Sequence, residues 1–148
     1  MIKHKQLFRH KPEEGIIGDC ERTAIACLLD LEPQEVPHFG EKYFDDWKAF
    51  NDMEDAYLLT QGYVRVQIPY ECDLNTFLRG ARLCNPSVYY LLSGQSKTGC
   101  NHTVVCCGDE IVWDPSLDDA DIIGPCTDGY YWATYLISTK FTKGEEDA

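Results

Sequence analysis

The sequence has few basic residues and no long hydrophobic run, and both shortages exclude classes of function. Its 148 residues contain 13 Lys and Arg against 25 Asp and Glu, which gives a net charge of −12. Such an acidic chain repels the phosphates of nucleic acids, so we expect no nucleic-acid partner. No apolar stretch approaches the roughly 18 residues of a membrane span, and residues 1–7 lack the apolar region of a signal peptide. We therefore expect a cytoplasmic protein without a membrane partner.

Several metal and redox motifs are also missing. None of the eight cysteines forms a Cys-x-x-Cys pair, which argues against zinc ribbons and thioredoxin-type sites. Without an export signal, we expect these thiols to be reduced. The acidic run at residues 118–121 lacks the Gly and the terminal Glu of an EF-hand loop. The sequence therefore predicts no metal and no cofactor.

The hydrophobic patterning predicts one domain over residues 1–148, with a core at about 15–138 and a disordered acidic tail at about 143–148. Helical periods dominate the first half, and alternating or continuous apolar runs dominate the part after residue 86. The expected helices are 20–31, one or two within 43–60, and 74–81, the last capped by Asp73. The expected strands are 63–68, which ends at Pro69, and 88–92, 102–107, 110–113 and 130–138. This order favours an α+β fold, in which the N-terminal helix that carries Cys20 packs against an antiparallel sheet.

The chain is organised around the stretch Gly18-Asp19-Cys20, which precedes an amphipathic helical pattern. Asp19 is a good N-cap residue, and Gly18 allows a sharp turn and a close approach by another molecule. Cys20 would then occupy the first helical position, where the positive end of the helix dipole favours thiolate over thiol. A buried free cysteine in the core is the alternative interpretation, so the case for a nucleophile needs a base elsewhere.

His102 is the best candidate for that base. It opens an apolar strand, and a turn at Gly108-Asp109 predicts that this strand pairs with residues 110–113. That register places Asp114 opposite Thr103, one step from His102. A carboxylate there could accept the Nδ1 proton of His102 and leave Nε2 to accept the proton of the Cys20 thiol. An Asp–His pair also occurs as ordinary structural bonding.

Together these residues resemble a known family. The segments that carry the resemblance are Gly18-Asp19-Cys20, Val36-Pro37-His38-Phe39, Asn101 to Val105, and Val112-Trp113-Asp114-Pro115. They look like the papain-like cysteine peptidase superfamily, nearest to its peptidase C39-like branch, which includes small proteins of phages and bacteria. The resemblance implies that Cys20 is the nucleophile, His102 the general base and acid, and Asp114 the orienting carboxylate. It also implies a location in the host cytoplasm if the protein is encoded by a phage.

One position departs from the family pattern. Papain-like and C39-like enzymes carry a Gln a few residues before the cysteine, where it helps to form the oxyanion hole. Here that neighbourhood contains Glu13 and Glu14, and an ionised carboxylate cannot donate to an oxyanion. The backbone N–H of Cys20 would still serve, and we take Asp19, Asn101 and Gln95 as the candidates for oxyanion or substrate-binding positions.

Three functions fit the sequence. The leading hypothesis is a cysteine hydrolase that uses Cys20, His102 and Asp114 on an amide, isopeptide or thioester bond of a protein or peptide substrate. A deamidase or an acyltransferase would use the same atoms. The second is a catalytically weak or inactive papain-like scaffold that binds and blocks a protein partner through its acidic surface. The third is a metal or redox protein built on a cluster of four residues: Cys100, His102, Cys106 and Cys107. The sequence leaves the oligomeric state open.

Overall fold

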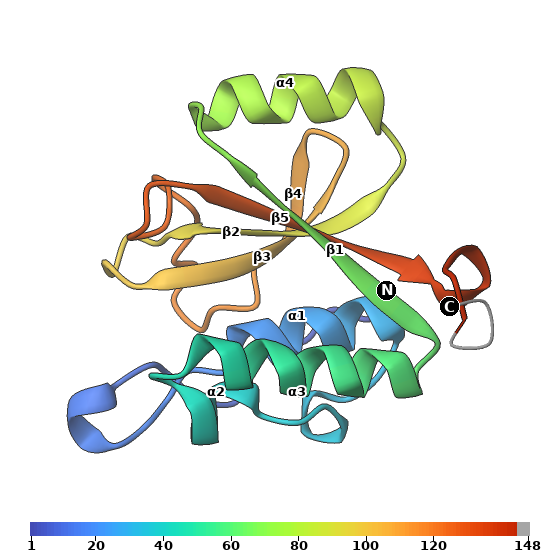
Figure 1. The fold of residues 1–148 in the computed structure, drawn as a ribbon. Helices are drawn as coiled ribbons and strands as arrows, with labels where there is room; N and C mark the ends of the chain where they lie inside the picture. Colours follow the sequence, from blue (N-terminus) through green and yellow to red (C-terminus); the bar gives the residue numbers. More distant parts are fainter. Residues whose placement is uncertain (145–148) are drawn as a thin grey trace.

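The computed structural model describes residues 1–144 and contains a five-stranded antiparallel sheet with helices on both faces (Figure 1). The α-helices are α1 (Cys20–Leu29), α2 (Phe39–Tyr43), α3 (Trp47–Thr60) and α4 (Leu74–Cys84). The strands are β1 (Tyr63–Tyr70), β2 (Tyr89–Gln95), β3 (Asn101–Cys107), β4 (Glu110–Trp113) and β5 (Tyr131–Ser138). Short 3₁₀ helices are η1 (Pro12–Glu14), η2 (Pro33–Glu35) and η3 (Thr139–Phe141). The expected α+β class with an antiparallel sheet is confirmed. Most of the expected tail lies outside the described residues.

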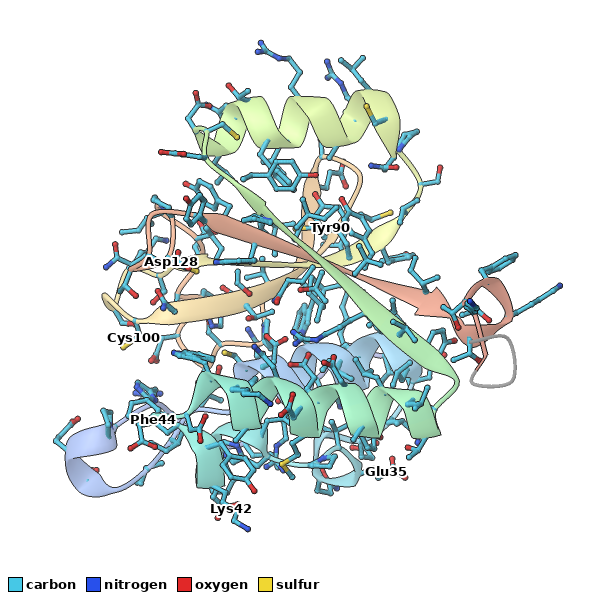
Figure 2. The ribbon with its side chains drawn as sticks, in the orientation of Figure 1. Glu35, Lys42, Phe44, Tyr90, Cys100 and Asp128 are labelled. Carbon is cyan, nitrogen blue, oxygen red and sulfur yellow. The ribbon has the colours of Figure 1, made fainter. Side chains whose placement is uncertain are left out.

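The sheet has the order β1-β5-β2-β3-β4 and separates two apolar layers. In Figure 1, α4 covers one face, and α1, α2 and α3 cover the other. Along β2 and β3, Leu91 and Val105 pack toward α1, whereas Leu92 and Val104 pack toward α4. Tyr90 fills the α4 side, as Figure 2 shows. Because both faces are buried, these central strands read as continuous apolar runs.

Helix α1 forms where its period predicted it, directly against β3. It ends two residues early, because Asp30 adopts a left-handed conformation with φ of 57° and its N–H bonds the carbonyl of Ala26. Asp73 caps α4 as expected, and its carboxylate accepts the N–H of Thr76 at 2.8 Å.

The boundary predicted at Pro69 is wrong. Strand β1 continues through Pro69 to Tyr70 and pairs with β5 along its whole length. It is an edge strand, and Pro is tolerated there because the missing N–H costs no ladder bond on the unpaired side. The segment after Val36 turns into α2 at Phe39, a short helix that the sequence did not predict.

Candidate active site

Cys20 is the first residue of α1, and its side chain is half-buried. The approach to it is tight. A Cβ at Gly18 would come within 2.9 Å of the Cβ of His10, and the N–H of Gly18 donates to Nδ1 of His10 at 3.1 Å. Gly18 is therefore required by contact with residue 10, whereas the sequence suggested room for a different molecule.

The expected N-cap role of the Asp19 side chain is wrong. Its fully buried carboxylate accepts the N–H groups of Leu7 at 3.2 Å and Phe8 at 2.8 Å, and it pairs with Nε of Arg22 at 3.0 Å. Arg22 also donates to the carbonyl of Val36 at 3.2 Å. Backbone amides from another segment and a guanidinium thus replace the helix amides as its partners. Asp19 therefore fastens the Cys20 turn to residues 7–8 and has no exposed surface to offer a substrate.

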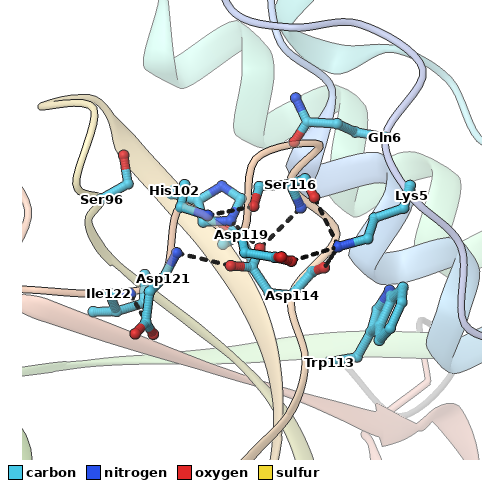
Figure 3. A network of polar contacts seen from close by, with 12 residues as sticks. Lys5, Gln6, Ser96, His102, Trp113, Asp114, Ser116, Asp119, Asp121 and Ile122 are labelled. Atoms are coloured by element: carbon cyan, nitrogen blue, oxygen red, sulfur yellow. Dashed lines mark hydrogen bonds and ion pairs between the residues drawn. The ribbon is translucent and has the colours of Figure 1, made fainter.

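His102 and Asp114 form the centre of the site (Figure 3). Nε2 of the buried His102 lies 2.7 Å from Oδ1 of Asp114. The same carboxylate accepts the N–H of Ser116 on Oδ1 and of Asp121 on Oδ2, both at 2.8 Å. These bonds leave Asp114 ionised, so Nε2 must carry the proton that it shares with Asp114. The two nitrogens therefore have the opposite roles to those we expected, and Nδ1 is the one available to Cys20.

The pairing of β3 with β4 explains how Asp114 reaches His102. Cys107 faces Glu110 and Cys106 faces Ile111, as predicted, but a bulge then brings Trp113 opposite Val105. The predicted pairing of Thr103 with Asp114 is therefore wrong by one position. Since β4 ends at Trp113, residues 101–104 of β3 have no strand on that side, and Asp114 turns across this free edge.

A lysine supports the loop that follows Asp114. Nζ of Lys5 donates to the carbonyls of Asp114 at 3.0 Å and Ser116 at 2.9 Å, and it pairs with Asp119 at 3.0 Å. It also lies 4.7 Å from the centre of the Trp113 ring (Figure 3). One cation thus fixes both sides of the Asp114 turn, which limits the movement of the carboxylate that holds His102.

The electrostatics of the site favour a charged histidine. Burial alone would lower the pKa of His102, but the negative charge of Cys20, hydrogen bonds to Asp114 and Cys20, and the charge of Asp114 together raise the pKa to about 10. Burial of Asp114 opposes its ionisation, yet the hydrogen bonds from His102, Ser116 and Asp121 hold its pKa well below the usual range. The arrangement therefore stabilises a charged His102 between Cys20 and the Asp114 carboxylate.

The two amide side chains expected near the oxyanion are used elsewhere. Nε2 of Gln95 donates to the carbonyl of Gly99 at 3.3 Å, and Asn101 exchanges two hydrogen bonds with Thr127. Neighbouring residues of a strand point to opposite sides, so Asn101 faces away from the side that His102 occupies. Gln95 ends β2 and Asn101 begins β3, at the end of the sheet where Figure 2 labels Cys100 and Asp128.

A glutamine that sequence reasoning missed lies beside the site. Gln6 is buried, its N–H donates to the carbonyl of Pro115 at 2.7 Å, and its Nε2 donates to the carbonyl of Phe8 at 2.5 Å. Figure 3 shows it next to the segment that carries Ser116. The next two residues, Leu7 and Phe8, bond to Asp19, so Gln6 is held close to the turn before Cys20. The intervening residues form a loop closed by a bridge between Lys11 and Ile16, which hides this Gln from a search by sequence spacing.

The proposed cysteine–histidine metal cluster is not assembled. Cys106 is buried toward α4, and Cys107 is the last residue of β3. Within residues 1–144, no group of three His, Cys, Asp or Glu side chains could hold a metal ion. The eight cysteines are unpaired.

Comparisons with protein-family models, with curated proteins and with solved structures found no match to this chain. A search of the described helices found none with the length and apolar character needed to cross a membrane.

Proposed function

We propose that this protein is a cysteine hydrolase with a papain-like catalytic arrangement, acting on an amide, isopeptide or thioester bond of a protein or peptide. One observation carries the proposal: His102 of β3 interacts with Cys20 of α1 on one side and with the Asp114 carboxylate on the other. Two regions far apart in the sequence supply these groups, since Cys20 begins α1 whereas His102 and Asp114 lie on the two sides of the β3–β4 hairpin. A cysteine with a base, and a base with an orienting carboxylate, form the general pattern of an activated nucleophile.

The chemistry follows from the roles of the atoms. The Cys20 thiolate attacks the acyl carbon, and the carbonyl oxygen becomes an oxyanion. His102 then gives its Nδ1 proton to the leaving amine or thiolate as the bond to the acyl carbon breaks, which leaves a thioester on Cys20. Neutral His102 next removes a proton from water, the hydroxide attacks the thioester, and Cys20 departs as thiolate. Asp114 stays ionised throughout and holds the imidazole in one orientation.

Two donors support stabilisation of the oxyanion. The N–H of Cys20 belongs to the first turn of α1, where helix N–H groups have no intrahelical acceptor. Gln6 supplies the second donor, because an amide nitrogen has two N–H groups and only one is used on Phe8. A donor from Gln6 favours activity over an inert scaffold, because the residues shortly before Cys20 include no Gln.

The test compares Cys20 with the other thiols of the same molecule. Limiting iodoacetamide, with the label located by mass spectrometry, makes the eight cysteines compete. Cys84 is the matched reference because it is exposed, whereas Cys20 is half-buried. We expect Cys20 to react first, already at pH 5–6, and to lose this preference in His102→Ala.

Turnover is tested with 4-nitrophenyl acetate. We expect a burst of 4-nitrophenolate that reports acylation of Cys20 and is absent in Cys20→Ala. If Cys20 reacts no faster than Cys84 and the burst persists in Cys20→Ala, the hydrolase proposal is wrong, and the scaffold that binds a partner becomes the better reading.

A further inference from the structure

A buried glutamate on α3 has no role in the mechanism above. Glu54 is 1% exposed, and no donor within the described residues reaches its Oε1. Its Oε2 lies 3.7 Å from a guanidinium nitrogen of Arg65 on β1, which is beyond hydrogen-bonding distance. A carboxylate buried this deeply is costly unless it is paired or protonated.

Glu54 lies against a second carboxyl group. Glu21 of α1 interacts with it through both charge and a side-chain hydrogen bond. Two ionised carboxylates cannot hydrogen-bond to each other, so the contact requires that one of them carries a proton. Glu54 is the more buried of the two, and burial together with the charge of Glu21 raises its pKa well above the usual range.

The charges around the pair favour one shared proton. Arg65 of β1 opposes the protonation of Glu54, and Asp55 of α3 supports it. Arg65 is itself bound by Asp55, which leaves one guanidinium among three carboxyl groups. Cys126, in the loop before β5, also feels the charge of Glu21, and burial raises the pKa of its thiol to about 12. The cysteine therefore stays neutral near pH 7 and does not compete for the proton.

Glu21 connects this pair to the catalytic groups. Its Oε2 accepts the hydroxyl proton of Thr103 at 2.6 Å. Because Thr103 has only one proton to donate, the hydroxyl of Ser93 on β2 must donate to Thr103 across 2.9 Å. Glu21 follows Cys20 in α1, and Thr103 follows His102 in β3. Two adjacent ties therefore join the same helix to the same strand, one catalytic and one structural.

We propose that protonated Glu54 holds Glu21 on Thr103, and that this buried carboxyl pair is a positioning device that sets Cys20 against His102. The inference rests on the proposed function. The proton of Glu54 lies between the two acids, and Glu21 remains the anion that accepts from Thr103. When the pH rises and the shared proton is lost, two anions face each other next to the Cys20 thiolate. Glu21 then moves off Thr103 and no longer sets Cys20 against His102.

The test measures the rate of Cys20 alkylation by iodoacetamide between pH 5 and 11, with Cys84 as the internal reference. In wild type, the rate of Cys20 alkylation should begin to decline at a lower pH than the one at which His102 loses its proton, because the pKa of His102 is about 10. Glu54→Gln keeps a donor toward Glu21 that cannot be lost, so it should keep the rate at pH 7 and abolish the early decline. Asp52→Asn is the matched control, because that exposed carboxylate of α3 pairs with Lys48 and takes no part in the contact between Glu54 and Glu21, and its profile should keep the decline.

Thr103 variants test the tie itself. Thr103→Val removes the hydroxyl and should lower the alkylation rate of Cys20 by about tenfold at every pH, because small misplacements of a reacting pair are expensive. Thr103→Ser restores the hydroxyl and should recover most of the rate. Thermal melts establish that each variant is folded.

The outcomes separate the two proposals. If Cys20 outcompetes Cys84 but the Glu54→Gln profile superimposes on wild type, the positioning role is wrong and the hydrolase stands. The positioning role is also wrong if Thr103→Val reacts as fast as wild type. If Cys20 shows no preference in wild type, the hydrolase proposal fails first, and the positioning role fails with it.

Discussion

Replacing Asp114 with Asn tests the electrostatic design of the site most directly. The side chain keeps its size but loses the charge that His102 faces at 2.7 Å. It also loses one acceptor, because the amide nitrogen cannot accept the N–H groups of Ser116 or Asp121 that the carboxylate binds at 2.8 Å. The Asp114→Asn variant therefore stabilises the His102 imidazolium less. It also places the new amide N–H groups opposite a backbone N–H, so that two hydrogen-bond donors face each other.

The size of the effect follows from the bond that is lost. A buried hydrogen bond to a charged group contributes about 1.5–3 kcal/mol, and each pKa unit corresponds to about 1.4 kcal/mol. Asp114→Asn should therefore lower the pKa of His102 from about 10 by roughly one to two units. The pH at which the reactivity of Cys20 begins to fall should decrease by the same number of units, because Cys20 loses its cationic partner when His102 deprotonates.

The assay is the pH profile of Cys20 alkylation by iodoacetamide in wild type and in Asp114→Asn, with Cys84 as the reference thiol. Asp128→Asn is a control, since this carboxylate is exposed and bonds Trp132 at 2.8 Å, outside the His102 network. If the alkaline fall occurs at the same pH in Asp114→Asn and in wild type, Asp114 does not stabilise the imidazolium, and the reasoning about the site is refuted.

Three further outcomes follow from the same contacts. Gln6→Ala should slow acylation by 4-nitrophenyl acetate by about 10²–10³-fold while leaving iodoacetamide alkylation of Cys20 unchanged, because only acylation develops an oxyanion. Asp19→Ala should lower the free energy of unfolding by about 3–5 kcal/mol in chemical denaturation, because it strands the buried charge of Arg22. Stability should also depend on His102, whose folded pKa is raised: its contribution is complete below the unfolded value of 6.5 and is lost as the pH rises through about 10. Cys20→Ala should reduce that loss, measured as the melting temperature between pH 6 and pH 10.

Each of these has a result that would contradict it. Equal acylation rates in Gln6→Ala and wild type would remove Gln6 from the oxyanion hole. The control for Asp19 is Asp52→Ala, which removes an exposed ion pair with Lys48 and should barely change unfolding; an Asp19 variant as stable as this one would contradict the buried role. For His102, a melting temperature that falls identically in wild type and Cys20→Ala would show that the pair is not coupled.

The sequence predicted the parts of the site that depend on local patterns. The period of α1 placed Cys20 at a helix start, and the turn at Gly108-Asp109 brought Asp114 to His102. The details that failed depend on long-range competition. Asp19 stands at the N-cap position of α1, but its carboxylate binds the backbone of residues 7–8 and the side chain of Arg22 in the protein interior. A capping rule that considers only the helix sequence does not predict these partners. The bulge between Val105 and Cys106 likewise shifts the strand register, which simple alternation cannot predict.

Gln6 shows how spacing in sequence can mislead. A search close to Cys20 found only Glu13 and Glu14, whereas the buried amide lies fourteen positions upstream by the numbering. Residues 11–16 turn back on themselves through η1, so the chain leaves and returns at nearly the same place. A loop of this kind adds residues without moving its two ends apart, and each added residue raises the free energy of closing the loop only slightly. A hydrogen-bond donor must lie near the site in space, whatever its distance in sequence. The bonds of Leu7 and Phe8 to Asp19 fix that position for Gln6.

The site is held together by polar ties that span long stretches of sequence. Asp19 binds residues 7–8, Lys5 binds the loop after Asp114, and Thr103 binds Glu21. None of these bonds can form until α1, β3 and the first residues of the chain have packed together. Cys20 and His102 therefore come together only when these three segments have packed. The same ties explain why a sheet edge without a neighbouring strand can hold His102 rigidly: its second layer of support comes from side chains.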